Sequence, residues 1–198
     1  DRFVGNSTAG NRFYQGPALE VGGLQRAGGC KEGGDGTFYV TSRISGARAP
    51  RLMQITPDGV LRVFMEKRGL IEGPLGECRS GGGVWNPKEK ALYLVGHNCL
   101  RKIVEKPDGT QWVEVVAGIP YQAPPPKKYG KPPVIKNGPA KEAVFQSHYR
   151  GAVCNSRGTI FWLEDTGLRR IENGVVSSVP LKFTDGAKQF SFIMGHNL

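Results

Sequence analysis

"SRGTIFWLEDTGLRRIENGVV", residues 156–176, decides the fold of this 198-residue chain. An apolar run at residues 159–163 ends in Glu-Asp-Thr-Gly, and Leu-Arg-Arg-Ile then leads into an Asn-Gly pair. Short runs of β-branched and aromatic residues are typical of strands, and Asn-Gly accepts the positive φ angles of a tight hairpin turn. The stretch therefore predicts two strands, a turn and a further strand that begins at Val175.

The same pattern occurs three times along the chain, at residues 35–64, 89–116 and 156–179. Each copy has an aromatic or aliphatic strand, a second strand with Leu and Ile three residues apart, an Asp-Gly or Asn-Gly turn, and a further strand. A Gly-rich approach with one more strand precedes each copy, and a Gly-Pro pair precedes that, at residues 16–17, 73–74 and 138–139. Each unit is therefore predicted to contain four short antiparallel strands.

The spacing of the units supports a repeat architecture. Ile55 and Ile103 are 48 residues apart, whereas Ile103 and Ile171 are 68 apart, and one insert at residues 118–137 accounts for the difference. A four-stranded unit that repeats every ~40–50 residues is typical of a β-propeller blade, because one blade cannot bury both faces without neighbours. We predict an all-β propeller with blades at residues 25–72, 73–117 and 138–182, and the start of a fourth at 183–198.

Several motifs of the chain resemble NHL-type propeller repeats. The resemblance rests on Val116-Ala117-Gly118, on Asn137-Gly138-Pro139-Ala140 with Ala143 and Phe145, and on "GTIFWLEDTGLRRI" at residues 158–171. It covers roughly residues 16–195 and is best in the third unit, where Asp165 keeps an Asp that Ser42 and Gly96 replace in the other units. It implies a propeller, usually of six blades. It implies no single activity, because such repeats occur in binding modules, ubiquitin-ligase regions and lyases.

Three units and the start of a fourth fall short of a six-bladed ring. The chain is a piece of a longer protein, or two copies form one ring, or residues 1–24 complete a fourth blade. The chain begins with Asp1 and has four cysteines, an even number compatible with two disulfides, so we expect an extracellular or periplasmic location. No apolar run is long enough for a membrane helix.

Composition narrows the class of partner. The 29 glycines and 14 prolines are too many for a helical protein. The formal charge of +10 favours an anionic ligand or an acidic protein partner, although positive residues spread along the chain also serve solubility. No motif specific for nucleic-acid binding is present.

Three histidines and one aspartate are the candidate metal ligands. They are His97, His148, His196 and Asp165. A propeller channel can gather neutral imidazoles from several blades around Zn²⁺, and Glu164, Asp165, Asn155 and Asn86 supply the oxygen ligands that Ca²⁺ prefers. Hydrogen bonding in loops is the alternative role for the histidines, and bracing of a turn is the alternative for Asp165. No cofactor besides Ca²⁺ or Zn²⁺ is predicted.

The cysteines allow one disulfide within a blade. Cys78 precedes the innermost strand of the second unit and Cys99 precedes its third strand, so both lie at the same end of a meander, with the second strand between them. Cys30, Trp85 and Cys154 align with one another on the innermost strands of the three units. A bridge between Cys30 and Cys154 would cross the channel, so these two are expected to be free thiols.

The insert at residues 118–137 is rich in proline and lysine and is expected to be extended. It is either a solvated loop or an arm that docks on a partner or an acidic surface. The residues that would make the docking contacts are Tyr121, Lys127, Lys128, Tyr129 and Lys131.

No residues form a recognisable catalytic group, since GxSxG and a Ser/His/Asp arrangement are both missing from the sequence. We therefore predict a non-catalytic binding or scaffold propeller module within a larger secreted protein or complex, with a protein partner or second chain completing the ring. The alternative is a hydrolase or lyase of the propeller type, lactonase-like or amidating-lyase-like, with a metal at the central channel.

Overall fold

The computed structural model describes residues 16–18, 24–25, 30–44, 50–65, 69–120, 134–146, 149–164 and 167–180. These residues form three antiparallel sheets, which we call blades one, two and three. Blade one contains β1 (Gly16–Pro17), β2 (Leu24–Gln25), β3 (Cys30–Glu32), β4 (Phe38–Ile44), β5 (Pro50–Ile55) and β6 (Val60–Met65). Blade two contains β7 (Gly73–Pro74), β8 (Gly82–Asn86), β9 (Ala91–Gly96), β10 (Cys99–Glu105) and β11 (Gln111–Gly118). Blade three contains β12 (Gly138–Pro139), β13 (Tyr149–Cys154), β14 (Ile160–Glu164), β15 (Gly167–Glu172) and β16 (Val175–Ser178).

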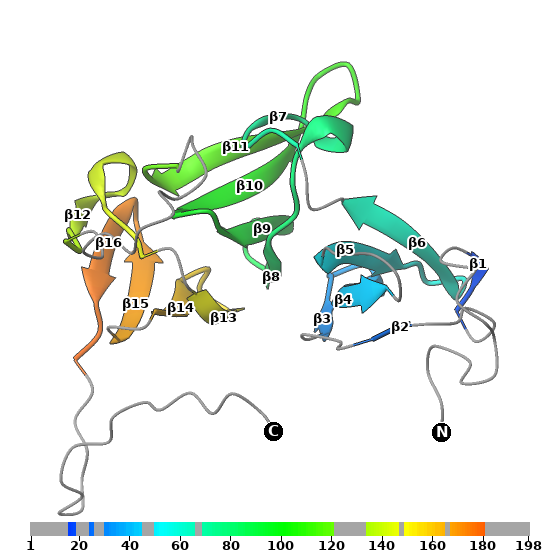
Figure 1. Ribbon diagram of the computed structural model, residues 1–198, viewed down its shortest axis with the longest axis horizontal. Coiled ribbons are helices and arrows are strands. Elements are labelled where there is room, and N and C mark those ends of the chain that lie inside the picture. Colours follow the sequence, from blue (N-terminus) through cyan, green and yellow to red (C-terminus); the bar gives the residue numbers. More distant parts are fainter. Residues whose placement is uncertain are drawn as a thin grey trace, which may run out of the picture.

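The three blades lie side by side along an arc (Figure 1). The strands β3, β8 and β13 lie on its inner side and the Gly-Pro strands lie on its outer side. Within each blade the four longer strands follow one another as an antiparallel meander. The predicted all-β architecture of repeated antiparallel blades is confirmed, and the chain forms part of a propeller. No helix among the described residues is long and apolar enough to cross a membrane.

Each Gly-Pro pair forms an additional two-residue strand that the sequence analysis did not predict. These strands pair antiparallel with the last long strand of their own blade, β6, β11 or β16. The φ angles of Gly16, Gly73 and Gly138 are 138°, 135° and 133°, and residues that have a Cβ atom rarely adopt such values. The proline that follows has no N–H to leave unpaired, which suits the edge of a sheet.

Strand register confirms most of the alignment between units and corrects one position. Trp85 pairs with Leu92, and Cys154 pairs with Ile160, so Trp85 and Cys154 are equivalent. In blade one the residue equivalent to Leu92 and Ile160 is Phe38, and it pairs with Glu32. Cys30 pairs with Val40 instead. Cys30 is therefore two residues out of register with Cys154, although the turns at residues 33–36 and 155–158 have the same length and make the same two backbone hydrogen bonds.

The core lies between the blades. We call the face of a blade that meets the preceding blade its leading face, and the opposite face its trailing face. Residues of the trailing face of blade one and the leading face of blade two form one buried cluster, which includes Leu52, Met65, Leu92, Leu94 and Val113. A second cluster joins blade two to blade three and includes Val84, Tyr93, Val95, Leu100, Ala152, Ile160 and Trp162. Burial of apolar surface between neighbours is thus what holds the blades together.

Candidate functional site

The leading faces of blades two and three carry the most deeply buried charged groups of the described residues. Arg101 on β10 is 0% exposed and Arg169 on β15 is 1% exposed. The two arginines are equivalent, because Arg101 pairs with Leu94 in blade two as Arg169 pairs with Trp162 in blade three. Met53 occupies the same position in blade one, opposite Val40. The repeat thus places a large side chain here in every blade, and a charged one in two.

Each arginine binds the segment that approaches its own blade. Arg101 donates from Nη1 to the carbonyls of Ile71 (3.2 Å) and Arg79 (2.7 Å), and from Nη2 to that of Ser80 (3.2 Å). These carbonyls lie outside the regular ladder of the sheet. A guanidinium offers five N–H groups in a fixed plane, so one side chain can satisfy several of them at once.

Arg169 makes the equivalent contacts and adds an ion pair. Nη1 donates to the carbonyl of Val144 (2.6 Å), and Nη2 donates to the carbonyl of Lys136 (2.9 Å) and to Asn137 Oδ1 (3.1 Å). Nη1 also lies 3.5 Å from Glu164 Oε2, and both side chains are at most 2% exposed. Burial lowers the pKa of Arg169 from its usual value and the Glu164 carboxylate opposes that shift, so the guanidinium stays charged.

Aromatic rings enclose this ion pair. The Trp162 indole N–H donates to Glu164 Oε1 at 2.8 Å. The Arg169 guanidinium lies 5.3 Å from the centre of the Phe145 ring and 5.8 Å from that of Trp162, which are cation–π distances. The two rings also pack against each other, with centroids 4.8 Å apart. The rings of Phe145 and Trp162 thus cover the ion pair, and Trp162 also binds its carboxylate.

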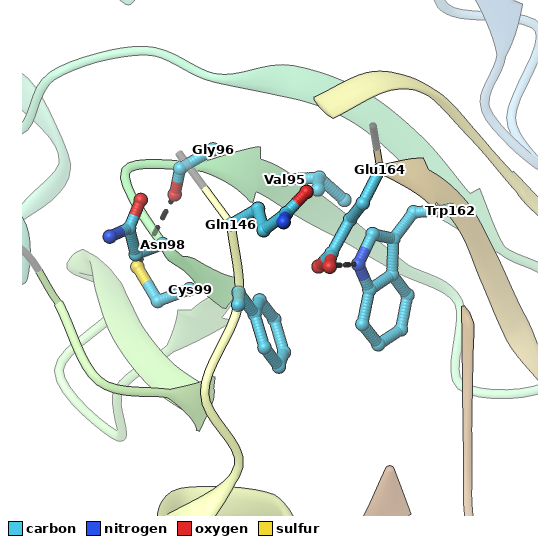
Figure 2. A pocket seen from close by; sticks show the side chains of 8 residues that line it. Val95, Gly96, Asn98, Cys99, Gln146, Trp162 and Glu164 are labelled. Atoms are coloured by element: carbon cyan, nitrogen blue, oxygen red, sulfur yellow. Dashed lines mark hydrogen bonds between the residues drawn. The ribbon is translucent and has the colours of Figure 1, made fainter. Parts of the chain in front are cut away.

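A small hollow opens beside Glu164 (Figure 2). Its lining side chains leave no room for a water molecule. Gln146 points into it between Val95 and Glu164. Among the described residues, Gln146 Oε1 and Glu164 Oε2 are buried oxygens that make no hydrogen bond, although Glu164 Oε2 has its ion pair. The hollow is therefore a packing seam between blades two and three.

A strained turn borders the hollow. His97 and Asn98 both have positive φ angles, 60° and 62°, between β9 and β10. Such pairs of angles form the tight hairpin turn that follows the twist of the strands. His97 Nε2 lies 3.1 Å from the carbonyl of Ser80, and since a carbonyl only accepts, Nε2 carries the proton. That nitrogen is therefore engaged in holding the approach segment and does not offer a lone pair to a metal.

The other predicted ligands cannot be compared with the structure. Asp165, His148 and His196 lie outside the described residues, as do Tyr121, Lys127, Lys128, Tyr129 and Lys131 of the insert. No group of three or more His, Cys, Asp or Glu side chains that could hold a metal ion occurs in the part of the chain that the structure describes. Asn86 and Asn155, the remaining candidates, cap turns: Asn86 Oδ1 accepts from the N–H of Lys88, and Asn155 Oδ1 from that of Thr159.

The structure does not form the disulfide predicted between Cys78 and Cys99. Both cysteines are buried free thiols, and Cys30 and Cys154 are free as well. The Arg101 guanidinium lies near both thiols. It binds the carbonyls of Arg79 and Ser80, just after Cys78, and so connects β10 to this segment without a disulfide. Burial raises the pKa of the Cys99 thiol to about 11. The extracellular or periplasmic location was inferred partly from an even number of cysteines. It stays a prediction, and the free thiols do not support it.

The sequence analysis did not identify the buried arginines as a functional element. The matched tetrapeptides at residues 100–103 and 168–171 contained them, but were interpreted only as strand anchors. An arginine that recurs directly after the leucine of both tetrapeptides is the signal that could have found them. The ion pair needed more, because Glu164 has no counterpart in blade two, where Gly96 occupies its place opposite Cys99.

Comparisons with known proteins bear on the fold. No protein-family model matches the chain, and no curated protein matches it. Among solved structures, a gluconolactonase from Xanthomonas campestris is similar to it, with 14% sequence identity and a TM-score of 0.47. The match covers 79% of this chain and 48% of that one, so this chain spans about half the length of the protein it resembles. At this identity the likeness concerns the propeller fold alone.

Proposed function

We propose that this chain is a non-catalytic binding or scaffold part of a larger β-propeller, built from NHL-type repeats and completed by a protein partner or a second chain. The observation that carries the proposal is the use made of the most deeply buried charges. Arg101, Arg169 and Glu164 bind backbone carbonyls, an indole N–H and one another, and so hold the approach segments against the blades. Groups employed in this way position a surface and do not face a substrate.

The repeat itself supports the assignment to NHL-type propellers. Arg101 and Arg169 stand two residues before an Ile, in the second conserved strand of each unit, where the family pattern also has an arginine-rich strand. The net charge of +10 gives the module a preference for an anionic ligand or an acidic partner.

Native mass spectrometry and metal analysis of protein purified without chelator test this proposal together. A scaffold module is expected to appear in an assembly heavier than the 21.5 kDa chain, with no stoichiometric metal and no turnover of lactone or ester substrates. A monomer with one bound Ca²⁺ or Zn²⁺ that hydrolyses a lactone would overturn it. Strong dependence of assembly on salt is expected if the partner is acidic.

A further inference from the structure

The trailing face of blade two shows what a covered blade surface looks like in this protein. Val84, Tyr93, Val95 and Leu100 lie on it and are between 0% and 7% exposed, because blade three packs over them. Register places them in two rows across the sheet. One row runs from Val84 through Tyr93 to Lys102, and the other pairs Val95 with Leu100.

The trailing face of blade three repeats these rows position by position. Val153 pairs with Phe161, and Phe161 pairs with Arg170, which reproduces the row Val84–Tyr93–Lys102. Leu163 pairs with Leu168, which reproduces Val95 and Leu100. The residue types correspond in each case: valine for valine, an aromatic for an aromatic, an aliphatic for an aliphatic, and a cation for a cation.

Exposure is where the two faces differ. Val153 is 55% exposed, whereas its equivalent Val84 is 1% exposed. Phe161, Leu163 and Leu168 are only half-buried, whereas their equivalents in blade two are buried. Val175, on the same side of the sheet at the β15–β16 hairpin, is 50% exposed. Apolar surface that is buried on one blade is therefore left open on the next.

We propose that the trailing face of blade three, formed by Val153, Phe161, Leu163, Leu168 and Arg170, is the docking surface for a further four-stranded β-blade. This inference rests on the proposed function, of which it names the partner and the surface. The argument is continuity with an established interface, since the equivalent face of blade two already receives a blade. The occupant is defined by the face that blade three itself presents to blade two.

The chemistry of that leading face specifies the partner. Blade three meets blade two with Ala152 on its innermost strand and with Ile160 and Trp162 on its second strand. The incoming blade is expected to present a small residue and two large apolar residues at these places. Arg170 lies 3.9 Å from Glu172 and its side chain is 46% exposed, so a carboxylate or carbonyl of the partner can reach it.

Blade one of a second copy does not fit this role. Its leading face carries Val40, Met53, Ile55 and Leu61, which are already buried, none more than 5% exposed. A second copy would have to uncover these residues before they could meet Val153. The geometry therefore favours a separate blade over a ring closed by two copies of this chain.

The test adds a blade whose leading face is known to fit. A second copy of residues 138–180 is fused to the C-terminus of the full chain, and thermal unfolding and amide hydrogen exchange are measured. Docking is expected to raise Tm by more than about 4 °C and to slow exchange in residues 151–164. An unchanged Tm and unchanged exchange would overturn the proposal.

Two variants make the test specific. Val153→Lys places a charge on the innermost strand of the face. It is expected to abolish the gain in the fused chain while leaving Tm of the parent chain within about 1 °C, because Val153 is exposed there. Val134→Lys is the matched control: Val134 is 87% exposed and precedes β12, so this change is expected to leave the gain intact. A gain that survives Val153→Lys would also overturn the proposal.

The failure of this inference is distinguishable from failure of the proposed function. The native assembly is measured with the parent chain and with Val153→Lys. An assembly that persists in the variant means that the module binds its partner through another surface, so only the docking face is wrong. Lactone hydrolysis by a metal-containing monomer means that the scaffold function is wrong, whatever the fused chain shows.

Discussion

Blades two and three keep the same buried arginine but surround it differently. Around Arg169 are Trp162, Phe145 and Glu164, whereas the positions equivalent to these around Arg101 are Leu94, Ser80 and Gly96. In both blades the guanidinium binds the carbonyls of the approach segment. Only blade three has a carboxylate, that of Glu164, beside the arginine, and only there do two aromatic rings cover the guanidinium. The repeat thus fixes the arginine and its backbone partners, while each blade fills the remaining volume in its own way.

Replacing Arg169 is expected to have the largest effect, because it leaves Glu164 as a buried, uncompensated charge. Arg169→Met should lower the free energy of unfolding by about 3–5 kcal/mol, the typical cost of breaking a buried ion pair. Urea unfolding followed by tryptophan fluorescence measures it, since Trp162 lies within the site. The double variant Glu164→Leu/Arg169→Met should recover part of this loss. A loss below about 1 kcal/mol would mean that the ion pair does not hold the blade.

Arg101→Met sharpens the comparison, since Met53 shows that the repeat accepts methionine here. The carbonyls of Ile71, Arg79 and Ser80 lose their donor, so we expect a cost of about 1–3 kcal/mol. The cost should be smaller than for Arg169→Met, because Glu164 is replaced by Gly96 in this blade. Met53→Leu serves as a control of matched position. Equal costs for the two arginines would show that the carbonyl contacts, not the ion pair, dominate.

The Gly-Pro strands offer a second comparison between the same two blades. Gly73→Ala and Gly138→Ala both force a side chain into a backbone with φ near 135°, which costs about 1–3 kcal/mol. A Cβ at Gly73 would also lie 3.3 Å from Leu70 Cδ1, whereas one at Gly138 would meet nothing within 4 Å. Gly73→Ala is therefore expected to be the more destabilising change in urea unfolding. The opposite order would mean that the outer edge of blade three is the more tightly packed.

Features that recur in all three blades could be predicted from the sequence, whereas features that occur in one blade could not. The units, their strands and the Asp-Gly and Asn-Gly turns follow from local patterns, and register confirms the match of Leu92 with Ile160. The predicted equivalence of Cys30 with Cys154 is wrong by two residues, because it matched the cysteines by residue type, whereas the register follows the turn that ends at Gly36 in blade one and at Gly158 in blade three. Glu164 was considered only as an oxygen ligand for Ca²⁺. Nothing in one sequence says that its partner is Arg169, which lies five residues along the chain and diagonally across the hairpin, since Glu164 pairs with Gly167 and Arg169 pairs with Trp162.

The titration of Cys99 distinguishes the two sites by pH. Cys99 stands where blade three has Gly167, and burial raises the pKa of its thiol from 9.0 to about 11. A thiol that ionises more easily in the unfolded chain favours unfolding as pH rises, so its contribution is complete below about pH 9 and is lost between pH 9 and 11. Stability should fall by about 1 kcal/mol by pH 10, and less so in Cys99→Ala. Other thiols and tyrosines contribute to both proteins equally, so an identical pH profile in the two would contradict this assignment.

Alkylation tests the free thiols without any expected change in stability. Cys30 is exposed, whereas Cys78 and Cys99 are buried, and burial raises the pKa of both buried thiols above the usual value for cysteine. The reaction is carried out at about pH 8, below the usual thiol pKa. Because the thiolate is the nucleophile, iodoacetamide should modify Cys30 first and leave Cys78 and Cys99 unmodified in the folded protein. In denaturant without reductant, all four cysteines should react, giving four adducts by intact mass. Two adducts would mean that one pair of cysteines is bridged. If peptide mapping located the two adducts on Cys30 and Cys154, the bridge would join Cys78 and Cys99, and blade two would have a covalent link beside Arg101 that blade three does not have.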